Sequence, residues 1–119
     1  MALSFTWLGH STYVFESDGN RLIVDPFLTN NPLIEVKPEE IDVSLILLTH
    51  AHGDHVGMTQ DNPADDTLAI AERTGATIVC NFEMGNWFLA QGVPQNQVFQ
   101  GNPGGTMRGE WVDVKWTQA

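Results

Sequence analysis

The stretch Thr49-His50-Ala51-His52-Gly53-Asp54-His55 holds three of the four histidines of the chain. It follows a nearly all-apolar segment, residues 44–49 (SLILLT), which we expect to form a strand buried on both faces. In an extended backbone His50 and His52 project to the same side. Two imidazoles on one side can share a divalent ion at about 2.0–2.1 Å each. The stretch therefore predicts a metal site at the end of a buried strand.

The second half of the same stretch provides further ligands. Gly53 permits a sharp turn of the chain, after which Asp54 and His55 point at a second position. Imidazole and carboxylate donors together suit Zn²⁺, Mn²⁺ or Fe. A solvated histidine-rich loop is the alternative, but four potential ligands in this spacing at the end of a buried strand favour a metal centre.

The sequence predicts mainly strands before this stretch, and helices that alternate with strands after it. Aromatic and β-branched runs with a hairpin signal at 17–20 predict an antiparallel meander, ended by Asp25-Pro26. The expected strands are 4–8, 12–17, 21–24, 44–49, 77–80, 98–100 and 110–117; the expected helices are 65–74 and 82–91, with one helical turn at 38–41 and a polar, turn-rich loop at 53–66. This order predicts an α/β sandwich of the α+β kind with a mixed sheet and flanking helices.

The amino-acid composition limits the classes of partner that the protein can bind. Five Lys+Arg against fifteen Asp+Glu give a net charge of −10, which argues against nucleic acid and against an anionic membrane surface. The sequence has no run of 18 apolar residues and no visible signal peptide. Its single cysteine, Cys80, rules out an internal disulfide and is expected to be a small buried hydrophobe. We expect a cytoplasmic protein that acts on a small molecule.

Several segments together resemble a known family. Residues 49–57 resemble the H-x-H-x-D-H motif of the metallo-β-lactamase superfamily. The segments 7–11 (WLGHS), 23–28 (IVDPFL) and 48–50 (LTH) resemble the UPF0173 metal-dependent hydrolases and their ascorbate-6-phosphate lactonase relatives. The resemblance extends along the whole chain, with residues 60–66 as a short insertion.

The resemblance implies an αββα sandwich with two metal ions, zinc as the first choice and manganese or iron as alternatives. By the family motif, His50 and His52 bind the first ion, and Asp54 and His55 bind the second. Asp54 also orients the nucleophile and is the expected catalytic residue. In this family a metal-bound hydroxide attacks the substrate, here a small ester, lactone, amide or phosphodiester.

Two further residues have expected supporting roles. Asp25 follows the third expected strand and is interpreted as a carboxylate that orients a ligand histidine, with an Asp-Pro turn former as the alternative. His10 matches the Gly-His-Ser element of the family, where it contacts substrate or ligates metal; a hydrogen-bonded turn histidine is the alternative.

Length is where the sequence departs from the family. The family domain is about twice as long, so residues 1–119 are expected to be its N-terminal half, with the C-terminal half absent from this chain. The motif then supplies about two ligands per ion, and one face of the sheet is left to be covered by a complementary C-terminal half chain or by a homo-oligomer. The alternative is a catalytically incomplete half-domain that acts as a metal-binding or oligomerisation module. An RNA-processing nuclease also fits the motif, but the acidic charge counts against it.

Overall fold

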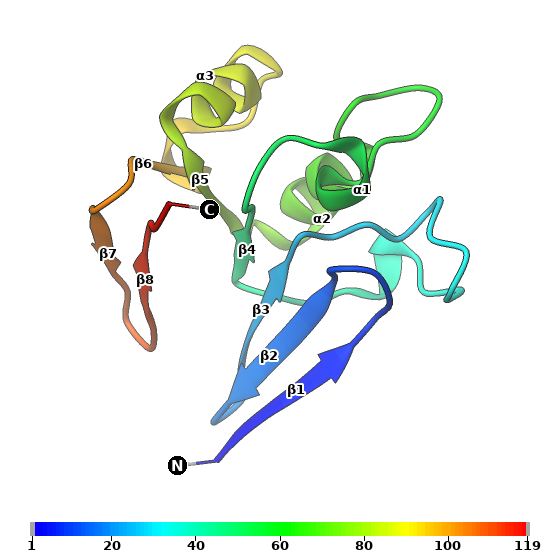
Figure 1. The fold of residues 1–119 in the computed structure, drawn as a ribbon, viewed down its shortest axis with the longest axis horizontal. Coiled ribbons are helices and arrows are strands. Elements are labelled where there is room, and N and C mark those ends of the chain that lie inside the picture. Colours follow the sequence, from blue (N-terminus) through cyan, green and yellow to red (C-terminus); the bar gives the residue numbers. More distant parts are fainter. Residues whose placement is uncertain (1, 119) are drawn as a thin grey trace.

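A six-stranded mixed sheet, with its strands in chain order, forms the centre of the molecule (Figure 1). The structure is a computed structural model and describes residues 2–118. The strands are β1 (Leu3–Trp7), β2 (Tyr13–Ser17), β3 (Asn20–Val24), β4 (Leu45–Leu47), β5 (Thr77–Asn81) and β6 (Val98–Gly101). β1, β2 and β3 pair antiparallel, whereas β3 to β6 pair parallel. The predicted mixed sheet with flanking helices is confirmed.

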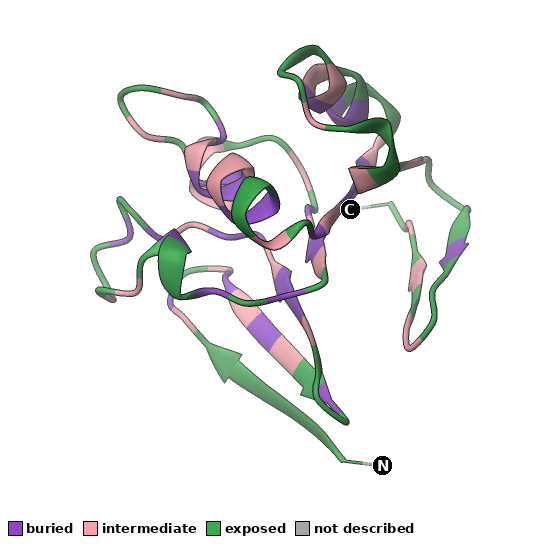
Figure 2. Ribbon diagram, turned by 180° about the vertical axis from the view of Figure 1, so that it is seen from behind, coloured by how far each residue is buried: buried purple, intermediate pink, exposed green. Residues whose placement is uncertain are grey.

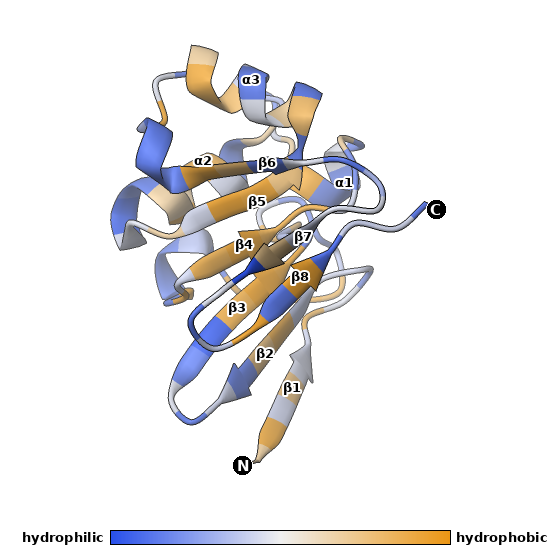
Figure 3. Cartoon of the chain, turned by 90° about the vertical axis from the view of Figure 1, so that its left-hand side faces the viewer, coloured by the Kyte–Doolittle hydropathy of each residue, from blue (hydrophilic) through white to orange (hydrophobic). Residues whose placement is uncertain are grey.

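The helices pack on one side of this sheet, and a small hairpin lies on the other (Figure 3). The helical elements are η1 (Pro38–Glu40), α1 (Gly53–Val56), α2 (Asp65–Thr74), α3 (Phe82–Ala90) and η2 (Gln95–Gln97); the hairpin is β7 (Thr106–Arg108) with β8 (Asp113–Lys115). No helix within residues 2–118 has the length and apolar character needed to cross a membrane.

The main core lies between the helices and the parallel strands. Ile23, Ile46 and Ile78 stand side by side on neighbouring strands and are fully buried. Ile70 of α2 and Phe88 of α3 belong to the same buried cluster. This continuous apolar layer fixes the parallel strands, and with them the loops that leave their carboxyl ends.

The ends of the two long helices follow from local chemistry. α2 spans the predicted residues and stops at Gly75, whose φ of 74° is a left-handed conformation that favours glycine. Asn81 caps α3, because its side chain accepts a hydrogen bond from the Met84 amide at 2.8 Å. Cys80, between these elements, is fully buried, and burial raises the pKa of its thiol to about 12.

Two sequence predictions need correction. Residues 53–56 form the helix α1 where a loop was expected, because four residues are too few for a helical pattern to stand out. The final strand, β8, is shorter than predicted. It pairs with β7, which was not predicted, and the two strands form a separate two-stranded sheet.

The hairpin covers part of the sheet face that is remote from the helices. Its turn lies beside the turn between β2 and β3, and the Trp116 indole N–H donates to the Cys80 carbonyl at 3.2 Å. The edge strand β1 is exposed at every described residue (Figure 2). Leu3 and Phe5 are 69% and 65% exposed. An apolar strip therefore remains at this edge of the sheet.

Candidate metal centre

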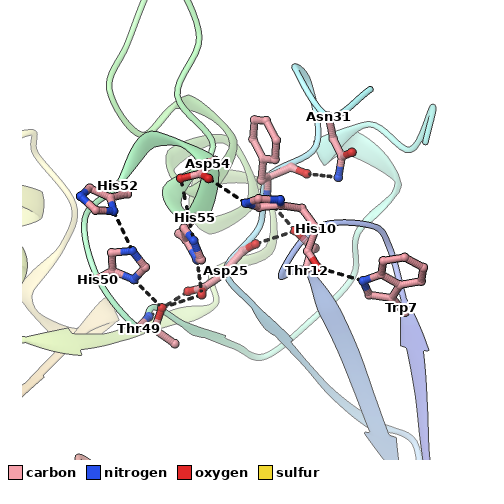
Figure 4. Close-up of polar contacts among 11 residues, drawn as sticks. Trp7, His10, Thr12, Asp25, Asn31, Thr49, His50, His52, Asp54 and His55 are labelled. Carbon is pink, nitrogen blue, oxygen red and sulfur yellow. Dashed lines mark hydrogen bonds and ion pairs between the residues drawn. The ribbon is translucent and has the colours of Figure 1, made fainter. Parts of the chain in front are cut away.

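The histidine-rich stretch lies where the parallel strands β3 and β4 end side by side. Asp25 follows β3, and Thr49 and His50 follow β4, so the topology brings residues far apart in sequence to one edge of the sheet. The turn between β1 and β2 adds His10 to the same place (Figure 4). All six predicted residues, which are His10, Asp25, His50, His52, Asp54 and His55, lie at this edge.

Asp25 is a buried carboxylate whose two oxygens already have partners. Its side chain is 2% exposed. Oδ1 accepts a hydrogen bond from the Thr49 amide at 2.8 Å, and Oδ2 accepts one from the Thr49 hydroxyl at 2.6 Å. Oδ2 also lies 2.8 Å from Nδ1 of His55. Because a carboxylate only accepts hydrogen bonds, Nδ1 of His55 carries the proton and Nε2 keeps a free lone pair.

The same carboxylate orients His50 through Thr49. The Thr49 hydroxyl has one proton, which it donates to Asp25, so it accepts at 2.9 Å from Nδ1–H of His50. Nε2 of His50 therefore presents a lone pair to the site. A carboxylate that holds histidines in their ligating tautomer is a frequent partner of metal-binding imidazoles. Sequence reasoning missed Thr49, although its place directly before the first histidine was a usable signal.

His50 and His52 lie with their rings on the same side of the chain, as the extended spacing predicted. Nε2 of His50 is 3.0 Å from Nδ1 of His52, and the ring centroids are 4.6 Å apart. Two nitrogens bound to one tetrahedral ion at about 2.1 Å each would be about 3.4 Å apart. Because Nε2 of His50 has no proton, Nδ1–H of His52 is the donor in this hydrogen bond. For both nitrogens to share an ion, the rings would move slightly apart and the proton of His52 would move to its Nε2.

Asp54 and His10 form the outer part of the site. Nε2 of His10 lies 2.7 Å from Oδ2 of Asp54, and Nε2 of His55 lies 3.8 Å from Oδ1. The hydrogen bond from His10 lowers the pKa of the Asp54 carboxyl, and nearby His55 adds to this effect. Asp54 is therefore ionised at neutral pH.

Two sets of possible ligand atoms each lie within 4.8 Å of one another. One set comes from His10, Asp54 and His55, and the other from Asp25, His50 and His55. Imidazole nitrogens and carboxylate oxygens are the donors that zinc, manganese and iron accept. The donor chemistry and the orientation of His50 and His55 both fit a divalent ion.

A comparison with protein families agrees with this geometry. The model of the β-lactamase superfamily domain matches residues 4–110 of the chain. The chain belongs to the β-lactamase superfamily. Among curated proteins, it is similar to a UPF0173 metal-dependent hydrolase of Methanopyrus kandleri, with 39% identity over 94% of the chain and 44% of the relative. A UPF0173 metal-dependent hydrolase of Ligilactobacillus salivarius is also 39% identical, over 95% of the chain and 47% of the relative.

Two solved structures have a similar fold. The metallo hydrolase Igni18 from Ignicoccus hospitalis superposes with a TM-score of 0.73 at 31% identity, over 90% of this chain and 43% of that one. The diiron β-hydroxylase CmlA of Streptomyces venezuelae matches with a TM-score of 0.59 at 17% identity, over 86% of this chain and 21% of that one, and shows likeness of fold alone. The chain spans about half the length of the curated relatives it matches.

Proposed function

We propose that this chain is the N-terminal half of a metal-dependent hydrolase. In this proposal His50 and His52 bind one divalent ion, and Asp54 and His55 bind a second. The tautomers of His50 and His55, both set by Asp25, carry the proposal, because they leave Nε2 of both rings without a proton at one edge of the sheet. Matches to relatives named metal-dependent hydrolases support it.

The chain's own residues have separate tasks in this function. Asp25 and Thr49 hold the ligating tautomers. Asp54, ionised and 46% exposed, is positioned to ligate and to accept a proton from an attacking water. A divalent ion held here would supply Lewis-acid activation of water and of the scissile group. Zinc is our first choice of metal, with manganese and iron as alternatives, since all three accept this donor set.

The proposed substrate is a small ester, lactone, amide or phosphodiester. A net charge of −10 disfavours long polyanions, whose binding depends on neutralisation by lysine and arginine. The rest of the ligand set and much of the pocket would come from a complementary C-terminal half, because the relatives are about twice as long.

A second candidate function is a catalytically incomplete module for metal binding or oligomerisation. The exposed apolar strip on β1 favours it, since such a surface can serve association without chemistry. The two functions share the metal centre and differ in activity.

Metal content and hydrolysis test the proposal. The purified chain would be equilibrated with Zn²⁺ or Mn²⁺, and bound metal counted in the wild type, His52→Ala and Asp54→Ala. Each substitution is expected to lower the number of ions bound, and unchanged metal in both would contradict the proposal. Hydrolysis of a p-nitrophenyl ester and of bis(p-nitrophenyl) phosphate, alone and with any copurifying chain, then separates the enzyme from the module, which would bind metal without turnover.

A further inference from the structure

We infer that the apolar pocket between α3 and the β4–α1 loop (residues 48–52) receives an apolar group of the substrate. This inference rests on the proposed function and narrows its substrate class. The substrate would be an ester, lactone or amide that carries an aromatic ring or a branched aliphatic group of similar size, rather than a phosphodiester.

The pocket lies between α3 on one side and α1 with the start of α2 on the other (Figure 1). Its volume is about 310 Å³, whereas an apolar cavity of about 150 Å³ already holds a benzene molecule. The buried residues of its wall are Val56 of α1, Ala64 at the start of α2, and Met84 and Phe88 of α3. Side chains of these types have no strong hydrogen-bonding group, so the pocket suits a hydrocarbon group.

Trp87 adds an aromatic ring to the wall of the pocket. The residue is half-buried, and its ring meets the Phe88 ring edge to face, with centroids 5.1 Å apart and 81° between the planes. This contact supports the indole beside the pocket, where the ring of a bound molecule can pack against it. Loss of the indole should therefore weaken the binding of an aromatic group.

The mouth of the pocket carries negative charge. Three lining residues are exposed and mark this mouth, namely Ala51, Pro63 and Glu83. Glu83 is the one charged residue among the described residues that line the pocket. The net charge of the whole chain, −10, has the same sign. A neutral or cationic substrate is therefore favoured, and an anionic phosphodiester is repelled.

Ala51 connects the pocket with the proposed metal centre, because it lies between His50 and His52 in the chain. The rings of His50 and His52 lie on one side of this extended segment, so Ala51 faces the opposite side, where it borders the pocket. The β4–α1 loop is thus a rim of one chain's width, about 5 Å, between the metal centre and the pocket. A linker of about three methylene groups between the reacting group and the apolar group of a substrate spans this width.

The test is a series of hydroxamic acids, each with a metal-binding hydroxamate and a phenyl ring, joined by linkers that range from none to four methylene groups. They would be titrated into the 119-residue chain loaded with Zn²⁺ and followed by NMR of the alanine and methionine methyl groups. Acetohydroxamic acid, which has no ring, is the reference. We expect short linkers to bind like the reference, and affinity to rise about tenfold once the linker reaches about three methylene groups, because the ring is then buried in the pocket.

Variants in α3 assign this gain in affinity to the pocket. Trp87→Ala should abolish the gain. Leu89→Ala, which truncates a half-buried side chain of the same helix outside the pocket lining, is the matched control and should keep it. Glu83→Gln should tighten the binding of a long-linker compound whose ring carries a carboxylate by about threefold, because it removes the repulsion at the mouth.

The outcomes separate this inference from the proposed function. Zinc-dependent binding of every hydroxamate with the affinity of the reference would overturn the role of the pocket and leave the proposed function intact. A chain that binds no zinc would overturn both. Should Trp87→Ala not fold, nuclear Overhauser contacts in the wild type decide. Contacts from the phenyl protons of a long-linker compound to the methyl groups of Ala64 and Met84 support the inference, and contacts to other parts of the chain contradict it.

Discussion

Thr49 links the carboxylate of Asp25 to the imidazole of His50 through one hydroxyl group. Its amide and hydroxyl both donate to Asp25, and its hydroxyl oxygen accepts a hydrogen bond from Nδ1–H of His50. The buried carboxylate thereby sets the tautomers of two candidate ligands that approach from different elements, His50 from the end of β4 and His55 from α1. Such indirect partners commonly account for a 10–100-fold share of metal affinity.

Thr49→Val tests this link, because valine has nearly the same shape and lacks the hydroxyl. We expect metal affinity to fall about tenfold, and the free energy of unfolding to fall by about 1 kcal/mol for the lost hydrogen bonds. Zinc competition and urea unfolding would measure the two effects. Thr49→Ser keeps the hydroxyl and is the matched control. Equal affinity in Thr49→Val and Thr49→Ser would mean that the hydroxyl does not orient His50.

At the scale of elements, the start of α2 holds the two arms of the site together. Asp66 is buried and accepts hydrogen bonds from the amides of Leu28 and Thr29 at 2.7 and 3.0 Å, and from the Thr29 hydroxyl. The next residue, Thr67, donates its hydroxyl to the carbonyl of Val56 in α1 at 2.8 Å. One turn of α2 thus fixes both the loop that follows Asp25 and the helix that carries the acidic ligand.

Asp66→Ala should therefore make the candidate metal centre less rigid, although Asp66 is not one of its proposed ligands. It leaves the amides of Leu28 and Thr29 without their acceptor, so we expect the free energy of unfolding to fall by about 3 kcal/mol. Hydrogen exchange of these two amides should speed up more than that of the β5 amides. Asp61→Ala, which removes an exposed carboxylate nearby, is the control and should change neither quantity. Unaltered exchange at Leu28 and Thr29 would show that Asp66 does not hold this loop.

The sequence predicted those parts of the site that depend on local patterns. The alternation of His50 and His52 and the apolar strand before them fix the direction of the side chains, and Asp25 could be placed because neighbouring parallel strands end at one edge. The helix α1 could not be predicted, since its four residues owe their conformation to contacts with α2. Nor could the tautomers, because they depend on a hydrogen bond between residues 25 and 55 that no local pattern contains.

At the scale of the whole molecule, apolar side chains remain exposed at the β1 edge of the sheet. Phe5 of β1 lies with its ring about equally far from Tyr13 and Phe15 of β2, at centroid distances of 6.1 and 5.9 Å. Together with Leu3 these side chains form an apolar strip beyond the reach of the β7–β8 hairpin. Proteins in solution seldom leave such a surface uncovered, and a complementary half or a second copy of the chain would cover it.

Two opposing forces act when two copies of the chain meet at this strip. Burial of apolar surface favours self-association of the chain, whereas a net charge of −10 makes two copies repel. We expect sedimentation velocity to show association that strengthens as salt rises, because salt screens the repulsion and leaves the apolar attraction. The double substitution Leu3→Thr and Phe5→Thr should abolish association and change the free energy of unfolding by only about 0.5 kcal/mol, since both side chains are largely exposed. Leu33→Thr, an equally exposed leucine outside the strip, should have no effect. Association that weakens with salt would instead mean that ion pairs, and not this strip, join the copies.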